Sequence, residues 1–326
     1  MKALVTGSCG FIGSHLTEEL LRRGYKVHVL LRKKSDLKWI RRLNTRPVMG
    51  DYSRPESLHS SVAGMDFIFH LAAVLHAPDW KTYYRVNTMG TRHLLQACAE
   101  VNPEMKKFVF VSTIAAAGPV FYKVFRDESH FSRPDSSYGK SKLLAEKEVM
   151  NFQNRIPVTI ARPPNVLGIR QRELLLVLKL LKKRFFPLLG NNDPQTSLCF
   201  VQDLVEALIL MAEKEQARSR MYYITDGKGY SWKNMLETIS RLLDVYPLTV
   251  KLPYPLLLAA ARLSEIYAGT AGKDPLISPR YIISSRYHYH LYRNGKIRRD
   301  LGFTAKIPFI QGMENIIRWY EQKGVL

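Results

Sequence analysis

The first half of the chain alternates short apolar runs with amphipathic stretches, and this alternation restricts the possible folds more than any other feature. The apolar runs predict strands at Lys2–Thr6, Lys26–Leu31, Pro47–Met49, Phe67–Leu71, Phe108–Ser112 and Val158–Ala161. The stretches between them predict helices at Phe11–Arg23, Leu37–Leu43, Tyr83–Ala99 and Ser137–Phe152. Because strands separated by helices pair in parallel and are covered on both faces, we expect an α/β protein with a doubly wound parallel sheet of Rossmann type.

The pattern changes after Gly168, where helical segments dominate. They are predicted at Glu173–Lys183, Val201–Glu213, Ser231–Leu243, Leu256–Ala268 and Ile310–Gln322. We therefore predict a nucleotide-binding domain over residues 1–168, to which residues 196–225 return. Residues 169–326 form mainly a substrate-binding region, smaller and largely helical.

Composition narrows the class of protein. The 326 residues are 46% apolar and carry a formal charge of +21. That apolar content excludes a disordered chain, and no apolar run approaches the ~18 residues of a membrane span. Three cysteines imply no disulfide framework, and no signal-peptide layout opens the chain, so we expect a cytoplasmic protein. The cations are spread out, without nucleic-acid-binding motifs, which indicates a solvated basic surface, with peripheral contact to anionic membrane as the alternative.

Three glycines follow the first predicted strand: Gly7, Gly10 and Gly13, with Phe11 and Ile12 between the last two. Glycine lets the backbone turn tightly and approach a pyrophosphate, which then lies at the N-terminus of the following helix. The strand–turn–helix context predicts a dinucleotide site. No pattern typical of a metal site accompanies it, and we interpret His70 as a packed or capping histidine.

The G-x-x-G-x-x-G spacing resembles the extended branch of the short-chain dehydrogenase/reductase superfamily. Three further segments fit this resemblance: Gly50-Asp51 after the third strand, His70-Leu71-Ala72-Ala73 after the fourth, and the N-x-x-G-T motif that begins at Asn87. The resemblance implies that Asp51 holds the adenine, that Leu71, Ala72 and Ala73 pass beside the cofactor ribose, and that Asn87 lies near the cofactor or packs its helix. It also implies a homodimer through Tyr83–Ala99 and Ser137–Phe152.

The end of the second strand distinguishes the two nicotinamide cofactors. An acidic residue there binds the ribose 2′-hydroxyl of NAD, whereas arginine accommodates the 2′-phosphate of NADP. This chain has Arg32, Lys33 and Lys34, and no carboxylate before Asp36. We therefore predict NADP(H), with NAD(H) as the alternative.

Tyr138 and Lys142 are four residues apart on a predicted helix, so they share one face. A nearby ammonium favours the phenolate and lowers the phenol pKa. In the resembled family the tyrosine moves a proton to or from the substrate oxygen, and the lysine also holds the nicotinamide ribose. The resemblance further implies that Thr113 orients the reacting oxygen and that Ser112 lines the cofactor. Pro163, Asn165 and Val166 of the R-P-x-N-V-like segment then pass the nicotinamide.

The C-terminal region bears on the substrate. Apolar Leu252–Ala261, the Lys296–Phe303 segment and Trp319-Tyr320 form a series similar to the 3-beta-hydroxysteroid dehydrogenase-like group. Thr196–Cys199 stands where sugar-nucleotide enzymes commonly have Arg-Asp. The resemblance implies an NADP-dependent oxidoreductase for a hydrophobic secondary alcohol or ketone of steroid, terpenoid, flavonoid or long-chain ketoacid type. The alternatives are a nucleotide-sugar 4-epimerase with tightly held cofactor, and a cofactor-binding regulatory protein. The Leu256–Ala268 stretch has three alternative roles: a helix of the core, part of the substrate lining, or a contact with the membrane.

Overall fold

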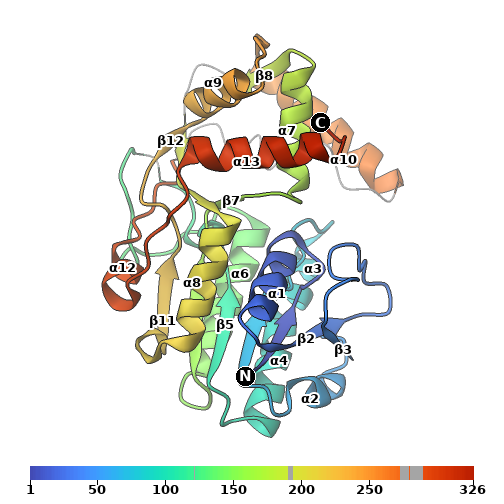
Figure 1. The fold of residues 1–326 in the computed structure, drawn as a ribbon, viewed down its shortest axis with the longest axis vertical. Coiled ribbons are helices and arrows are strands. Elements are labelled where there is room, and N and C mark those ends of the chain that lie inside the picture. Colours follow the sequence, from blue (N-terminus) through green and yellow to red (C-terminus); the bar gives the residue numbers. More distant parts are fainter. Residues whose placement is uncertain (121, 190–193, 272–278, 280–288) are drawn as a thin grey trace.

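A seven-stranded parallel sheet forms the lower body of the molecule (Figure 1). The computed structural model describes residues 1–120, 122–189, 194–271, 279 and 289–326. The strand order is β11-β6-β5-β4-β1-β2-β3. In chain order the strands are β1 (Lys2–Thr6), β2 (Lys26–Leu31), β3 (Arg46–Met49), β4 (Phe67–His70), β5 (Lys107–Val111), β6 (Val158–Arg162) and β11 (Arg220–Tyr223). The α/β fold with a Rossmann-type parallel sheet is therefore confirmed.

Helices cover both faces of the sheet, which explains why its central strands are apolar throughout. α1 (Phe11–Arg22) and α8 (Val201–Glu213) share one core cluster with the sheet. On the other face, α2 (Glu56–Val62), α4 (Gly90–Val101) and α6 (Ser137–Asn151) share a second cluster.

The chain reverses its direction of winding at β1, which pairs with β2 on one side and β4 on the other. At such a switch point the loops that leave the carboxyl ends of neighbouring strands diverge, and in α/β sheets they leave a crevice for a ligand. The glycine loop follows β1 directly, and the turn at Leu71–Ala73 follows β4. The topology thus brings two of the predicted cofactor segments to one edge of the sheet.

Two of the predicted helices differ from the structure. Residues 80–101 form one continuous helical run, but its middle is a π-helix: α3 (Trp80–Tyr83), η1 (Tyr84–Met89) and α4. The predicted helix at Leu37–Leu43 is wrong, because these residues form turns. A segment of seven residues is shorter than an independently stable helix, and here Trp39 packs instead against Trp319, with ring centroids 6.4 Å apart.

The upper part of the molecule contains α7 (Arg172–Lys182), α9 (Trp232–Leu242), α10 (Tyr254–Ala271) and α13 (Phe309–Gln322), close to their predicted positions. Three two-stranded sheets were not predicted: β7 (Asn165–Leu167) with β10 (Leu198–Phe200), β9 (Gln195–Thr196) with β12 (Tyr230–Ser231), and β8 (Phe185–Leu189) with β13 (Leu248–Leu252). Short elements α5 (Ile114–Ala117), η2 (Glu215–Ala217) and α12 (Gly295–Leu301) complete the fold. Within the described ranges, no helix has the length and apolar content needed to cross a membrane.

Candidate active site

The glycine loop is built for close approach of main chain to main chain. Gly7 has a φ of +70°, and a Cβ atom there would lie 2.8 Å from the Ala72 nitrogen. A Cβ at Gly13 would lie 2.1 Å from the Gly7 oxygen. Gly10 is the N-cap of α1 and provides no side-chain cap. Gly7 and Gly13 therefore have to be glycine for the loop to close.

This loop fits a dinucleotide. Its uncapped helix N-terminus offers N–H groups and a positive dipole end to a pyrophosphate. The Ser8 hydroxyl is buried and has no hydrogen-bond partner in the described structure, which leaves a polar group available for a ligand. Phe11 and Ile12 are only partly buried and pack against the core cluster under the sheet. The Phe11 ring also packs against Gly168, where a Cβ atom would lie 2.9 Å from Phe11 Cζ.

The loops after β2 and β3 lie side by side, because these strands are paired. Arg32 and Lys33 are exposed at the end of β2, and the Arg32 N–H donates to Ser35 Oγ over 2.9 Å. After β3, Asp51 Oδ1 accepts hydrogen bonds from both the backbone N–H and the hydroxyl of Ser53, which lower the pKa of Asp51. Arg32 also lowers the Asp51 pKa through its charge.

A chain of hydrogen bonds runs beneath this crevice. The N–H groups of Leu71 and Ala72 donate to Thr6 Oγ1 over 3.2 Å each, and Thr6 Oγ1 lies 2.7 Å from His70 Nδ1. His70 Nε2 lies 3.0 Å from Thr91 Oγ1, whose own proton goes to the Asn87 carbonyl. Thr91 therefore accepts from His70, so we assign the proton of a neutral His70 to Nε2.

Burial lowers the pKa of His70 to about 3, with a further contribution from the charge of Lys142. A neutral ring at ordinary pH agrees with the hydrogen bonds on both of its nitrogens. His70 is thus a packed histidine that joins β1, the strand before the glycine loop, to the first turn of α4.

Asn87 of η1 extends this chain to α6. Its Nδ2 donates to Ser141 Oγ over 3.0 Å and to the Val74 carbonyl, while its Oδ1 accepts from the Val74 N–H. The Ser141 hydroxyl donates in turn to the Tyr138 carbonyl over 2.7 Å. The side chain of Asn87 therefore holds the segment after Ala73 against the helix that carries Tyr138. The predicted contact of Asn87 with the cofactor stays a prediction.

Tyr138 and Thr113 lie at the starts of two helices that touch. Tyr138 is in the first turn of α6, half-buried, with its ring centroid 6.3 Å from that of Tyr83. Thr113 is the N-cap of α5 and accepts from the Ala115 N–H over 3.2 Å. A Cβ atom at Gly139 would lie 2.2 Å from the Ala115 oxygen, so the two turns are in direct backbone contact. Sequence reasoning missed Gly139, although it lies within the predicted motif.

Lys142 is fully buried one turn after Tyr138. Its Nζ donates to the Val111 carbonyl over 2.9 Å and lies 4.1 Å from the centre of the Phe110 ring. Burial lowers the pKa of Lys142 to about 7, against an opposing contribution from the charge of Glu146. A cation held in so apolar a place gains strongly from an added anion or hydroxyl acceptor. The predicted role of Lys142 beside a Tyr138 phenolate stays a prediction.

A buried ion pair, which the sequence did not reveal, adjoins this helix. Arg162 at the end of β6 contacts Glu146 through Nε (2.8 Å) and Nη2 (2.5 Å). The Ser112 hydroxyl donates to the same carboxylate over 2.5 Å. The sequence signal that could have indicated this ion pair is the position of Glu146, one helical turn after Lys142. Ser112 is thus engaged in fixing β5, β6 and α6 together, and its predicted role beside the cofactor stays a prediction.

The segment after β6 closes this part of the site. The Pro163 carbonyl accepts from the N–H of Ile114, beside Thr113. Asn165 Nδ2 donates to Thr196 Oγ1 over 3.4 Å, and buried Val166 pairs with Cys199 between β7 and β10. The three predicted residues Pro163, Asn165 and Val166 therefore lead from the turn of Thr113 to the upper part of the molecule, and their predicted contact with the nicotinamide stays a prediction.

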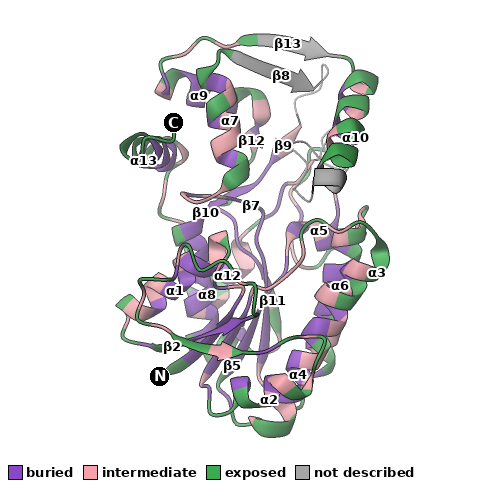
Figure 2. Cartoon of the chain, turned by 90° about the vertical axis from the view of Figure 1, so that its right-hand side faces the viewer, coloured by how far each residue is buried: buried purple, intermediate pink, exposed green. Residues whose placement is uncertain are grey.

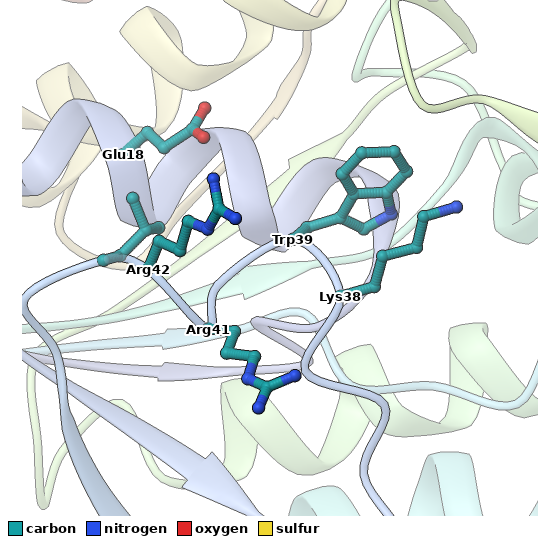
Figure 3. A pocket seen from close by; sticks show the side chains of 6 residues that line it. Glu18, Lys38, Trp39, Arg41 and Arg42 are labelled. Carbon is teal, nitrogen blue, oxygen red and sulfur yellow. The ribbon is translucent and has the colours of Figure 1, made fainter.

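A cavity of ≈ 820 Å³ lies apart from these predicted residues (Figure 3). It is lined by Glu18 of α1 and by the loop after β2, with Lys38, Trp39, Arg41, Arg42 and Leu43. The Arg170 guanidinium lies 5.0 Å from the Trp39 ring. Within the described ranges, no three His, Cys, Asp or Glu side chains are grouped to hold a metal ion.

Known proteins resemble the chain over nearly its whole length. A ketoreductase of Stigmatella aurantiaca, named for 4-hydroxy-2-methyl-3-oxo-4-farnesyl-3,4-dihydroquinoline-1-oxide, is 25% identical over 320 residues, covering 96% of this chain and 95% of that protein. The N-acetyl-alpha-D-glucosaminyl-diphospho-ditrans,octacis-undecaprenol 4-epimerase of Escherichia coli O157:H7 is 28% identical over 328 residues, covering 97% and 94%.

Solved structures also match the fold over almost the whole chain. The UDP-glucose 4-epimerase of Thermotoga maritima, solved with UDP-glucose, superposes with a TM-score of 0.81 at 22% identity and 99% coverage of both chains. The model of the NAD dependent epimerase/dehydratase family matches residues 3–224, which include the glycine loop, Thr113, Tyr138, Lys142 and β11. The chain therefore belongs to the NAD-dependent epimerase/dehydratase family, a group of extended short-chain dehydrogenases/reductases, and is an enzyme that acts on CH–OH groups.

Proposed function

We propose that the chain is an NADP-dependent oxidoreductase that interconverts a hydrophobic secondary alcohol and its ketone. The observation that carries the chemistry is the backbone contact between Gly139 and Ala115, which brings the turn of Tyr138 against the turn of Thr113. A bound nicotinamide supplies or accepts the hydride. Tyr138 moves the proton at the substrate oxygen, Thr113 orients that oxygen, and buried Lys142 favours the phenolate of Tyr138.

The preference for NADP rests on the loop after β2. Arg32 and Lys33 are exposed where the adenosine ribose lies in Rossmann folds. The first carboxylate of this loop, Asp36, accepts from the backbone N–H of Lys38 over 2.9 Å. A 2′-phosphate of about two negative charges suits the exposed cations better than a ribose hydroxyl does.

Two observations support an apolar substrate. The Thr196–Cys199 segment, which precedes α8, is uncharged and buried. It therefore offers no cation to a sugar diphosphate. Both relatives described above are named for molecules with an isoprenoid chain, a farnesyl group in one and undecaprenol in the other. A long hydrocarbon chain is thus common to a ketoreductase and an epimerase.

The second candidate is an epimerase for a nucleotide sugar or a lipid-linked sugar. The 28% identity to the undecaprenol-linked 4-epimerase favours it. In that reaction the same Tyr138 and Lys142 act twice, the cofactor is regenerated within each cycle, and no net oxidation occurs.

Calorimetric titration separates these candidates. UDP and a UDP-sugar are titrated into the NADP-saturated protein, and NADPH absorbance is followed in parallel with farnesylated, steroid and long-chain ketones. We expect no binding of UDP and consumption of NADPH with at least one apolar ketone. Tight binding of UDP without consumption of NADPH would replace this proposal with the nucleotide-sugar epimerase, and the absence of both would overturn it in favour of the epimerase for a lipid-linked sugar.

A further inference from the structure

α10 exposes an apolar face to solvent. Four large side chains on this helix are mostly exposed: Leu256 (61%), Leu263 (67%), Ile266 (65%) and Tyr267 (71%). At about 100° per residue, Leu256, Leu263 and Tyr267 fall within roughly 40° of one another, with exposed Ala260 beside them. Ile266 borders this face, about 60° from Leu263. We call Leu256, Ala260, Leu263, Tyr267 and the bordering Ile266 the α10 stripe.

The stripe is not the side by which α10 packs onto the protein. Leu257 and Ala261 are buried, and they pack with Tyr254 and Leu258 on the other side of the helix. Between residues 254 and 267 the only charged residues are Arg262 and Glu265. A surface helix normally shows polar residues on the side away from the core. An apolar outer face of this kind marks a site of contact with another apolar phase.

A second exposed apolar group lies on the same side of the molecule. Both figures place α3 below α10, and Figure 2 shows the two helices along the same edge of the molecule. Trp80 of α3 and Tyr84 of η1 are exposed there, next to the exposed cations Lys81 and Arg85. Tryptophan and tyrosine mixed with lysine and arginine are typical of surfaces that lie at the boundary between lipid headgroups and acyl chains.

We propose that the α10 stripe docks onto an anionic lipid bilayer, with Trp80 and Tyr84 as a second point of contact. The charge favours this partner, because the chain carries a formal +21 and because the exposed cations Lys81 and Arg85 outnumber the one carboxylate, Asp79, beside Trp80 and Tyr84. On α10, Arg262 lies beside Ile266, and Glu265 is on another side of the helix. The arrangement also favours it, because the ring of Tyr83 in α3 lies 6.3 Å from that of Tyr138. Docking along this edge brings the proposed catalytic tyrosine near the lipid phase. The inference deepens the proposed function, which requires an apolar substrate.

Vesicle co-sedimentation tests the docking without reference to turnover. The full chain with NADPH is mixed with vesicles of phosphatidylcholine alone, or of phosphatidylcholine with phosphatidylglycerol, at low and at moderate salt. We expect binding to the vesicles that contain phosphatidylglycerol. The double variant Leu263→Asn/Ile266→Asn is expected to reduce the affinity for these vesicles by roughly tenfold or more. Arg262→Glu is expected to weaken vesicle binding and to reduce the salt dependence of that binding.

Ile310→Asn is the matched control. Ile310 is also an exposed isoleucine on a helix, but it lies at the start of α13, away from α10 (Figure 1). The Ile310→Asn variant is expected to bind the vesicles as wild type does. Equal binding by wild type and the double variant, or no binding by wild type, overturns the proposal. A stripe that instead mediates self-association appears as a dimer in size-exclusion chromatography that the double variant dissociates, and this too overturns it.

Activity on a short, water-soluble ketone separates this inference from the proposed function. If the double variant loses vesicle binding but reduces that ketone like wild type, docking and chemistry are both supported. If no ketone is reduced while vesicle binding depends on the stripe, the proposed function fails and the docking surface stands.

Discussion

Gly139 of α6 packs against the Ala115 carbonyl of α5 so closely that a Cβ atom on Gly139 would lie 2.2 Å from that oxygen. Thr113 caps α5, and Tyr138 lies in the first turn of α6. The spacing of the two proposed catalytic side chains therefore depends on the absence of a side chain at position 139.

Replacing Gly139 with alanine is expected to push the two turns apart. Displacement of catalytic groups by about 1 Å can cost roughly 100-fold in rate, and overpacking lowers the free energy of unfolding by about 1–3 kcal/mol. Steady-state kinetics and urea unfolding measure the two effects. Lys140→Ala is the control, because Lys140 is exposed in the same turn. Wild-type kcat/KM in Gly139→Ala would show that the contact does not position Tyr138.

Tyr138→Phe removes the hydroxyl that is the proposed proton carrier and keeps the ring. We expect kcat to fall by roughly 10²–10⁴-fold, with the Kd for NADPH nearly unchanged in a fluorescence titration. Tyr83→Phe is the matched control: the two rings are neighbours, but the Tyr83 hydroxyl donates to the Leu75 carbonyl. Comparable losses in both variants would contradict the role of Tyr138.

Because of Lys142, the free energy of unfolding of the cofactor-free protein is expected to vary with pH in the neutral to alkaline range. Its pKa is about 7 in the folded chain, below its usual 10.5, so the unfolded chain binds more protons between these values. The free energy of unfolding therefore rises with pH across this window, by about 2 kcal/mol from pH 7 to pH 9. Urea unfolding should show this rise in wild type and in Lys140→Met, whose lysine is exposed, but not in Lys142→Met. Parallel curves for all three proteins would contradict the assignment.

His70 makes stability depend on pH with the same sign as Lys142, but in the acid range. Its folded pKa of about 3 lies below the usual 6.5, so stability is lost as pH falls from 6.5 toward 3. At pH 7, His70→Phe leaves Thr6 and Thr91 without their ring partner and is expected to lower the free energy of unfolding by about 2–4 kcal/mol. The difference from wild type should shrink between pH 6.5 and pH 4.5. A constant difference would mean that the ring is not the group that titrates.

Arg32→Asp tests the cofactor preference. The new carboxylate repels a 2′-phosphate and can accept from a ribose 2′-hydroxyl, so the ratio of the Kd values for NADPH and NADH should increase by roughly 100-fold or more. Arg41→Asp makes the same charge change in the same loop, but Arg41 lines the cavity of Figure 3. An equal shift in both variants would indicate a general field of the loop rather than a contact at Arg32.

The sheet was predictable from sequence because its strands carry their own signal. Runs such as Lys26–Leu31 are buried on both faces, and their apolar character does not depend on their partners. β8 and β13 were missed because a parallel pair between Phe185–Leu189 and Leu248–Leu252 depends on contacts far apart in the chain. At Leu37–Leu43 a helix was predicted that the structure does not contain. The apolar residues of this short segment have helical spacing, but the segment forms turns and Trp39 packs against Trp319.

The candidate site was predictable where residues act at a fixed spacing on one element. Tyr138 and Lys142 belong to one helix, and Gly7 and Gly13 belong to one turn. The hydrogen-bond chain through His70 could not be read in this way, since it joins five elements, β1, β4, α4, η1 and α6, that only the folded sheet brings together.

The contact between Gly7 and Ala72 has a consequence for ligand binding. Because the loop after β1 touches the turn after β4 through main-chain atoms, and Thr6 hydrogen-bonds the same turn, neither segment can shift alone. A dinucleotide that binds over them meets walls whose conformational freedom was already lost when the chain folded. The entropy of ordering is then absent from the binding step, and affinity reflects preorganisation more than the number of contacts made.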